Sequence, residues 1–592
     1  MAKKSLRENI RYSFDSIMSK GTFSLIGFLA IIISILVVIF TIVTWLIDLI
    51  PGQSIGELFW VNIFQIVGAW TLPNAVPGHI NFLISFLIGL TSIFVTSILI
   101  GLIATGINQK VQSLREGRSK VKESGHTIIL GWSEVVYTII ESLMEANRNQ
   151  RRCKIVIMGN KDKVEMEGAI SEKLKISRNT RIICRKGYPV NINDLKIVNL
   201  SESKSIIIVE DTDSKVLKTI LAINNSKKGL RSIPYNIVAV LRDGKNTDSG
   251  KIAGEGQASF ILNSCFIARL IAHTCYQPGL SLVYNELLKF KGNEIYARNF
   301  RELAGRSFSE AKFMFENSSL IGIKDGNTVR LNPAGDTLIR DNDEMVLICS
   351  DDVAIIPSKK EKYDINQEAI NISEKKEDEM EKILILGWNR KAKMIIDELI
   401  KYVSPKTQIT IVAETSPHAE FEEHEKEEEV IIIGGVRIHF IHGDINDHDL
   451  LTRLSGEGFN HVVVLAYTSK ETQEADCITL MTLIHLRDIA EKNDLDFSIT
   501  SEMLDISNRD LVKVAKVNDF IISEKLTSLL LTQISENRLL DPIFEDLLCE
   551  SGSEIYLKKV RDFIRIDEPV DFYTVLEAAG QKNDLAIGYK IN

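Results

Sequence analysis

The longest stretch of this chain without a charged residue runs from Leu58 to Gln109. It holds two apolar segments with a short segment rich in Pro, Asn and Gly, residues 72–79, between them. The second apolar segment, 80–107, is longer than the roughly 20 residues that a helix needs to cross a bilayer. Non-helical backbone persists at membrane depth only where protein buries it or where it lines a watery cavity. The pattern therefore predicts an ion pore.

A further spanning helix is predicted upstream, at residues 22–50. Residues 23–46 are almost purely apolar, and Trp45 at the far end is typical of the membrane interface. Lys and Arg are absent from 51–79 but crowd both flanks. By the positive-inside rule the flanks are cytosolic and the loop lies outside. We therefore expect a multi-pass membrane protein with both termini in the cytoplasm.

The loop between the spanning helices is predicted to contain a pore helix, 54–70, and a filter tip, 71–79. Ser54 and Glu57 have the spacing of a capping box, which starts a helix. The tip has no acidic side chain, so backbone carbonyls, an amide and water would coordinate the ion, which favours potassium over calcium. The alternative is an ordinary extracellular loop, and the long uncharged run argues against it. The residues expected to line the narrow part of the pore are Asn74, Ala75, Val76, Pro77, Gly78 and His79.

An internal repeat organises the rest of the chain. The run HTIILGW at 126–132 recurs as KILILGW at 382–388, and each enters a glycine turn and then a helical pattern. Further strand patterns follow in step in both copies, which predicts βαβ units and parallel sheets. A second repeat, LLxxxGxEIY, begins at Leu287 and again at Leu547. Strands matching 331–349 are missing from the second copy, so its small lobe is incomplete or is completed by another chain.

The predicted fold class is multidomain: an α-helical two-span membrane pore domain, then two cytosolic α/β Rossmann-like units with small α+β C-terminal lobes. The membrane part is divided into a basic leader at 1–20, a pore domain at 21–109 with its second spanning helix at 80–108, and a link to the soluble part at 110–123. The first unit is 124–357 (Rossmann-like 124–283, small lobe 284–357), a Lys/Glu-rich linker is 358–380, and the second unit is 381–592 (Rossmann-like 381–540, small lobe 541–592).

Composition and motifs exclude several classes of function. The net charge of −9 argues against a nucleic-acid partner. Seven scattered cysteines without CxxC give no zinc site. The turns at Gly131 and Gly387 lack G-x-G-x-x-G and place Trp where a dinucleotide needs glycine. No nucleophile motif is present, so we expect no enzyme and no cofactor beyond regulatory calcium. The alternative is a membrane-anchored nucleotide-sensing regulatory or redox protein.

Two oxygen-rich clusters are candidate calcium sites, because calcium takes six to eight oxygen ligands. Solvated turns are the alternative. The candidate ligands are Glu210, Asp211, Asp213, Asp444 and Asp447.

The segment 107–119 joins the second spanning helix to the first Rossmann-like unit without a flexible Gly/Ser linker. We expect the soluble units to act on the pore through it. The residues assigned to this gate are Gly101, Gly106, Lys110, Arg115 and Arg118.

Several blocks of the sequence resemble the CASTOR/POLLUX ion-channel family. They include KVQSLREGRS at 110–119, HTIILGWS at 126–133, QPGL at 277–280 and AIGY at 586–589. The resemblance implies a homotetrameric cation channel in the lipid membrane. Each subunit would bring a pore and two RCK (regulator of conductance) units, which form a calcium-regulated cytosolic gating ring. The family's tip resembles A-D-A-G-N-H, whereas this chain has PNAVPGH, and its short leader favours a prokaryotic plasma-membrane homologue.

Overall fold

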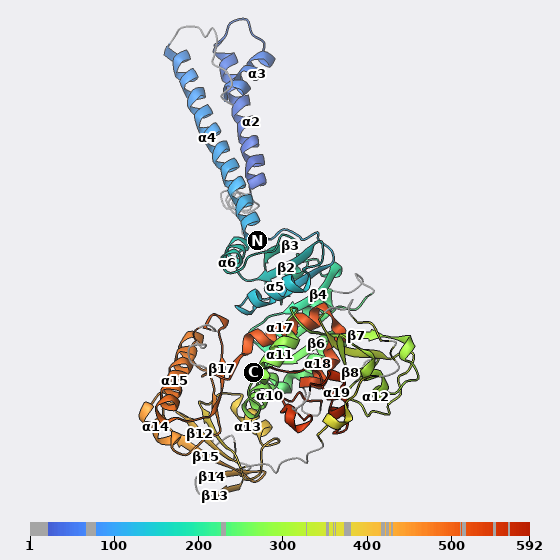
Figure 1. The fold of residues 1–592 in the computed structure, drawn as a ribbon. Helices are drawn as coiled ribbons and strands as arrows, with labels where there is room; N and C mark the ends of the chain where they lie inside the picture. The colour runs from blue at the N-terminus through green and yellow to red at the C-terminus, as the bar shows by residue number, and fades with distance from the viewer. Residues whose placement is uncertain are drawn as a thin grey trace, which may run out of the picture. The chain divides into compact units, whose positions relative to one another are not determined.

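The computed structural model describes residues 22–66, 79–226, 233–326, 328–350, 355–358, 360, 363–371, 380–415, 421, 425–427, 430–508, 511, 517–548, 552–565 and 569–591. The chain divides into two compact units, Met1–Arg118 and Ser119–Asn592 (Figure 1). Each unit is a body with its own core.

The membrane unit contains α2 (Thr22–Leu46), α3 (Ile55–Ile66) and α4 (His79–Glu116). Among the residues that the structure describes, two helical segments are long and apolar enough to cross a membrane, Ile26–Leu46 and Phe82–Glu116. The capping box before α3 is confirmed: Ser54 N donates to Glu57 Oε2 at 2.9 Å and Glu57 N to Ser54 Oγ at 3.4 Å.

Two predicted helix ends in the membrane unit were wrong. The first spanning helix was expected to reach residue 50, but α2 ends at Leu46 and the chain turns at Asp48, where φ is 50°. The second was expected to end at 108, but α4 runs to Glu116. The segment INQKVQSLRE has good helix formers and no Gly or Pro, and Gly117, with φ of 76°, follows as a left-handed C-terminal glycine.

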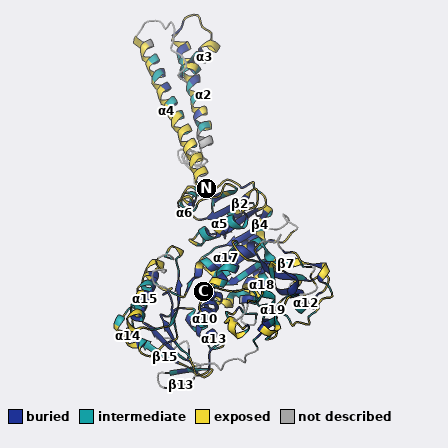
Figure 2. Ribbon diagram, in the orientation of Figure 1, coloured by how far each residue is buried: buried dark blue, intermediate teal, exposed yellow. Residues whose placement is uncertain are grey.

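The first Rossmann-like sheet is fully parallel, with the order β3-β2-β1-β4-β5-β6. Its strands are β1 (His126–Leu130), β2 (Cys153–Gly159), β3 (Thr180–Lys186), β4 (Ser203–Ile208), β5 (Ile237–Leu241) and β6 (Ala258–Leu262). The connecting helices are α5 (Val135–Ala146), α6 (Lys163–Lys173), α7 (Ile192–Leu195), α8 (Asp213–Ser226) and α9 (Thr247–Gly254). Alternate residues of each strand enter separate cores on the two faces, which explains the continuous apolar runs. The strands of this sheet are mostly buried (Figure 2).

The second sheet repeats this parallel order as β15-β12-β11-β16-β17-β18 and adds the antiparallel strands β14 and β13 at one edge. Its strands are β11 (Lys382–Leu386), β12 (Gln408–Ala413), β13 (Glu425–Glu427), β14 (Val430–Ile433), β15 (Val436–His442), β16 (His461–Val464), β17 (Ser498–Met503) and β18 (Asp519–Ile522). Its helices include α13 (Ala392–Leu399), α14 (His448–Ser455) and α15 (Thr472–Asn493).

The two Rossmann-like units pack through exchanged helices. In each unit the last strand leads into a long helix, α10 (Asn263–Tyr276) or α17 (Ser523–Glu536), and a second helix follows, α11 (Leu280–Leu288) or α18 (Asp541–Leu548). Helix α10 packs against α13 of the second unit, and α17 packs against α5 of the first. The repeat seen in the sequence is therefore a pseudo-twofold arrangement of two similar units.

The small lobes differ, as the sequence predicted. The first contains α12 (Phe308–Ala311) and an antiparallel sheet of order β7-β10-β8-β9, formed by β7 (Glu294–Asn299), β8 (Ser318–Asp325), β9 (Thr328–Leu331) and β10 (Glu344–Cys349). The described residues 552–565 and 569–591 include no strand and one α-helix, α19 (Phe572–Gly580). The carbonyls of Asn583 and Ile587 accept hydrogen bonds from Asn332 and Ser319 of the first lobe.

The predicted linker, 358–380, was partly wrong. Its described residues 363–371 pack onto the second small lobe, where Asn371 N donates to Phe563 O and Arg565 N to Ala369 O, both at 2.8 Å. Ala369 and Ile370 share a small core with Ile564. Residues 365–370 hold two isoleucines among polar side chains, and the burial of Ile370 and partial burial of Ile365 add to these hydrogen bonds.

Candidate functional site

The short helix α3 packs against both spanning helices. Its buried residues are Leu58, Asn62 and Ile66. The Asn62 amide donates to Thr44 Oγ1 at 3.2 Å, to Thr41 Oγ1 at 3.4 Å and to Leu58 O at 2.8 Å, so it ties α3 to α2. In an apolar surrounding such bonds fix the register of a short helix. The sequence predictions overlooked Asn62, because one polar residue in an apolar run carries no periodic signal.

The predicted filter residues Asn74, Ala75, Val76, Pro77 and Gly78 lie outside the described residues. His79 is the first residue of α4 and is exposed. The segment that holds the filter prediction is thus bounded by α3 and α4.

The predicted gate residues occupy the C-terminal half of α4 and the residues just after it. Gly101, Gly106, Lys110 and Arg115 are in the helix, and Arg118 follows Gly117. A Cβ added to Gly101 would meet no atom within 4 Å. Arg118 Nε lies 3.6 Å from Glu116 Oε2. The next residue already contacts the soluble unit, where Ser119 O accepts from Arg185 Nε at 2.6 Å, and Val121 N donates to Ile197 O at 2.7 Å.

In the cluster at Glu210, Asp211 and Asp213, each side chain has a different surrounding. Asp211 pairs with Lys215 at 2.8 Å, and this hydrogen bond lowers the pKa of Asp211. Burial raises the pKa of the half-buried Glu210. Asp213 accepts from the backbone N–H groups of Arg242 and Asp243 at 2.9 and 3.1 Å and from the Asn246 amide at 2.7 Å. Burial would raise the pKa of Asp213, but these bonds outweigh it and lower the pKa.

The role of Asp213 is repeated in the second unit by Asp476. Asp476 accepts from the backbone N–H groups of Leu504 and Asp505 and from the Asn508 amide, all at 2.9 Å. Asp213 is the first residue of α8, the helix that follows β4, and it holds the loop after β5. Asp476 lies near the start of α15, the helix that follows β16, and it holds the loop after β17. The pair is a structural anchor, and three donors already occupy Asp213.

The other predicted calcium ligands cap local structure. Asp444 Oδ1 accepts from Asn446 N at 2.8 Å, which closes a turn. Asp447 is the N-cap of α14 and accepts from the N–H groups of Asp449 and Leu450. Calcium binding at either cluster remains a prediction.

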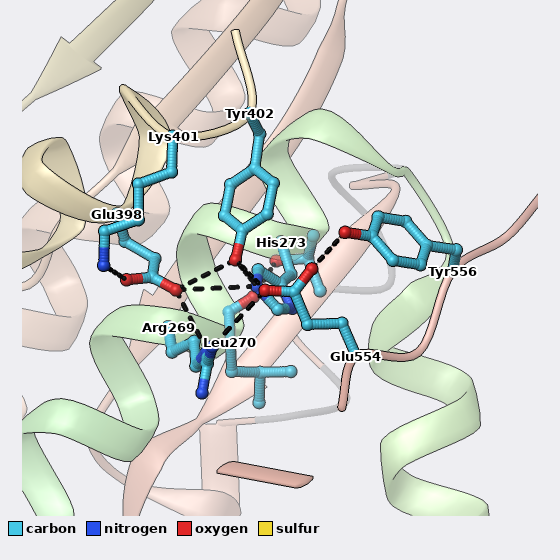
Figure 3. Close-up of polar contacts among 9 residues, drawn as sticks. Arg269, Leu270, His273, Glu398, Lys401, Tyr402, Glu554 and Tyr556 are labelled. Atoms are coloured by element: carbon cyan, nitrogen blue, oxygen red, sulfur yellow. Dashed lines mark hydrogen bonds and ion pairs between the residues drawn. The ribbon is translucent and has the colours of Figure 1, made fainter. Parts of the chain in front are cut away.

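A buried polar network that the sequence predictions missed joins the two Rossmann-like units (Figure 3). Arg269, 4% exposed, lies in α10 with Nε 2.9 Å from Glu398 Oε1 and Nη2 3.3 Å from Glu554 Oε1. The Tyr402 hydroxyl lies within hydrogen-bond distance of both carboxylates, to one of which it can donate its single proton, and 2.9 Å from His273 Nε2. Tyr556 donates to the second oxygen of Glu554.

The network is electrostatically matched. Burial would raise the pKa of Glu398, but hydrogen bonds with His273 and Lys401 and the charge of Arg269 lower it to about 2. Burial and the neighbouring carboxylates raise the pKa of Tyr402, so it stays a hydroxyl donor. Among the described residues, His273, Glu398 and Glu554 are the group whose potential metal-ligand atoms lie within 4.8 Å of one another. Arg269 already supplies the positive charge there.

The glycine turns that end β1 and β11 are too tight for any other residue. A Cβ on Gly131, with φ of 112°, would lie 1.9 Å from Val209 O, and one on Gly387 would lie 2.7 Å from Leu465 O. Trp132 packs over Gly159 and edge-on to Tyr137, with ring centroids 5.8 Å apart. The Trp132 side chain therefore lies between the turn after β1 and the end of β2, at the turn where the pyrophosphate of a dinucleotide would have to approach the backbone.

The chain is similar in sequence to known ion channels. Residues 264–366 match the family model "Castor and Pollux, part of voltage-gated ion channel". The rice protein "Probable ion channel CASTOR" (Oryza sativa subsp. japonica) is 28% identical over 92% of this chain. This chain is similar to the CASTOR and POLLUX ion channels. The resemblance to this family that the sequence indicated is confirmed. The alignment covers 64% of the rice protein, so this chain spans less than two-thirds of that protein's length.

More distant similarities extend to other channels. The Bacillus subtilis (strain 168) protein "Putative potassium channel protein YugO" is 23% identical over 54% of this chain and 94% of its own length. The solved structure "GsuK channel bound to NAD" has a TM-score of 0.42 and 14% identity over 88% of this chain and 84% of its own. A TM-score below 0.5 is too low to transfer a property. The relatives are named as ion channels, in agreement with the expectation that this chain is not an enzyme.

Proposed function

We propose that this chain is the subunit of a tetrameric cation channel, permeable to potassium, that its two RCK units gate in response to a ligand. The observation that carries the proposal is α3, a short capped helix that packs on both spanning helices and is tied to α2 by Asn62. In sequence order, α3 is followed by residues 67–78 and then by α4. A pore helix, a filter and a second spanning helix have the same order. The names of the relatives support the channel class.

The tetramer follows from what one chain can enclose. Two spanning helices and one pore loop cannot surround a pathway, whereas a cyclic assembly with heterologous contacts closes a ring. Large apolar side chains on α4 are exposed in the single chain, among them Phe86 at 66% and Phe94 at 62%. Such a surface needs lipid or neighbouring subunits to cover it.

Potassium is proposed as the permeant ion because the tip carries no carboxylate, the usual ligand for divalent cations. The name of the B. subtilis relative agrees with potassium. Calcium is the first candidate for the gating ligand, on the resemblance to the plant channels, and a prokaryotic plasma membrane is the proposed location.

Reconstitution of the full chain in liposomes tests the proposal. We expect a tetrameric mass in detergent, potassium flux, and a bi-ionic reversal potential that favours potassium over calcium. Asn74→Ala and Gly78→Ala should change that selectivity, while His448→Ala, in the soluble unit, should not. A stable conducting monomer or dimer, or a strong preference for calcium, would refute the corresponding part of the proposal. Nucleotide binding without any flux would instead favour a membrane-anchored sensor.

A further inference from the structure

The two small lobes line a cavity of about 1120 Å³ that is open to solvent on one side, slightly larger than the roughly 300–1,000 Å³ found for small-molecule sites. One wall is a face of the first lobe's sheet, with Ile295, Ile321 and Ile348 as buried members. Neighbouring residues such as Leu320 and Leu347 point to the opposite face, where they form a separate core with α12. The sheet therefore carries apolar side chains on both faces, and those on the cavity side also belong to the large core of the soluble unit.

The second small lobe supplies the opposite wall, and it is also mainly apolar. Its lining side chains include Leu547, Ile555, Leu557, Phe563 and Leu585. Strands are lacking in the described part of this lobe, so an extended segment and α19 cover the first lobe's sheet loosely. A cavity of this size between apolar walls favours an aliphatic ligand.

Most charged groups at the cavity already have partners. Lys558 Nζ lies 2.6 Å from Asp584 Oδ2, Asp571 caps α19 through Thr574 N, and Glu554 belongs to the Arg269 network. Lys590 differs, because it forms no hydrogen bond or ion pair with any described residue, although its charge acts on Asp519. A Cβ on Gly279, with φ of 95°, would lie 2.2 Å from Lys590 Nζ, so the ammonium lies directly over the Gly279 backbone.

We propose that this cavity binds a long-chain fatty acid, with its alkyl chain between the two lobes and its carboxylate at Lys590. The apolar walls match the chain, and the ammonium without a bonded partner matches the head group. The cavity is also linked to the contact between the two units, because Glu554 and Tyr556 line it and bind Arg269 and Tyr402 through the network. A fatty acid in the cavity would therefore bias the contact between the two Rossmann-like units. This regulatory role rests on the proposed channel function, whereas the binding of the fatty acid does not.

Photolabelling tests the binding directly. The full chain in lipid nanodiscs is irradiated with a diazirine analogue of palmitic acid, and labelled peptides are mapped by mass spectrometry. We expect label in residues 552–591 and 318–331, and we expect unlabelled palmitate to compete better than its methyl ester. Leu331→Trp, which fills the cavity, should strongly reduce the label. Leu338→Trp is the matched control, since Leu338 belongs to the same lobe, is 63% exposed and does not line the cavity.

The head-group contact has its own variant pair. Lys590→Glu should weaken palmitate competition roughly three- to tenfold, as expected for reversing one exposed charge, and should abolish the advantage over the ester. Lys559→Glu, an exposed lysine outside the lining, should change neither. Label confined to the membrane helices, label unaffected by Leu331→Trp and Lys590→Glu, or cross-links to a second copy of the chain in this cavity would each overturn the proposal. None of these readouts depends on ion flux.

Discussion

At the scale of single residues, Arg269 is the side chain on which most depends. It is buried in α10 and faces two carboxylates that come from the second unit. Arg269→Met would remove the cation that Glu398 and Glu554 share; Lys401 would still pair with Glu398, whereas Glu554 would lose its cationic partner in the network. Breaking a buried ion pair in this way costs about 3–5 kcal/mol. We therefore expect a clear fall in the thermal unfolding temperature of the full chain. Arg301→Met, at an exposed position, should stay within about 0.5 kcal/mol of wild type. Equal effects of the two substitutions would contradict a structural role for the network.

The protonation of Glu398 makes the same network sensitive to pH. Its folded pKa of about 2 lies below the ordinary value of 4.5, so the ionised group stabilises the fold above that value. This stabilisation should disappear as the pH falls from about 4.5 towards 2. The measurement is the difference in unfolding free energy between wild type and Glu398→Gln from pH 7 down to pH 2. The difference should be large at neutral pH and shrink in that window. For Glu141→Gln, an exposed control, it should be small throughout.

At the scale of elements, Asp213 and Asp476 each connect the N-terminal part of a helix to the loop that follows the next strand. Asp213→Ala removes the acceptor for two backbone N–H groups and one amide and should cost about 2–3 kcal/mol. Asp476→Ala should cost a similar amount, since it removes the same set of bonds. Asp211→Ala removes only an exposed ion pair and should change stability by less than about 1 kcal/mol. Urea unfolding midpoints of the three variants provide the test.

This distinction also decides how calcium sensing should be tested. Replacing Glu210, Asp211 and Asp213 together would confuse ligand loss with the loss of the anchor. The double substitution Glu210→Ala/Asp211→Ala leaves the anchor intact. If calcium binds here, the calcium dose-response of flux should move to higher concentration, while the urea midpoint should remain close to that of wild type. An unchanged dose-response would leave these residues as an ordinary turn.

The elements that sequence predicted well are those with a local signal. The capping box of Ser54 and Glu57 started a helix, and two apolar runs that end in Gly131 and Gly387 became central parallel strands. The ends of helices were predicted less well, because α4 continues through polar helix-forming residues after its apolar run stops. Residues 363–371 looked like a solvated linker, since only a tertiary contact with the second lobe buries them.

The network at Arg269 could not be predicted in the same way. Arg269 and Glu554 are separated by 285 positions in the sequence, and His273 and Tyr402 by 129. An arginine inside the apolar run FIARLIAH was the one available signal, because a buried charge needs a partner. The hydrophobic periodicity of the sequence does not show which residue pairs with Arg269. The acidic clusters, by contrast, had a composition suited to calcium, but Asp213, Asp444 and Asp447 already accept hydrogen bonds from backbone N–H groups.

At the scale of the whole molecule, the soluble unit is built by making the same contacts twice. Ser259 Oγ donates to Asp541 Oδ2 at 2.5 Å, and at the related position Asp519 Oδ1 accepts from Ser281 N at 3.0 Å. The aspartate is in the helix of one copy and in the strand of the other. The Arg269 network has no such twin, because Leu529 occupies the matching position of α17. A ligand that acts on this network would therefore affect the two halves of the interface unequally.

The link between membrane and soluble units gives the last prediction. Helix α4 continues to Glu116, and Ser119 O already accepts from Arg185 Nε at 2.6 Å, so only Gly117 and Arg118 lie between. A six-residue Gly/Ser insert after Arg118 would add a flexible spacer about 13 Å long on average. A ligand bound to the soluble unit can shift the gate only if the conformational change that it favours also moves α4. A flexible spacer would let the soluble unit move without moving α4. We expect ligand-dependent flux to vanish while ligand affinity and basal flux persist. The same insert between Lys375 and Lys376 should preserve the response. If both insertions preserve it, force does not travel through this link.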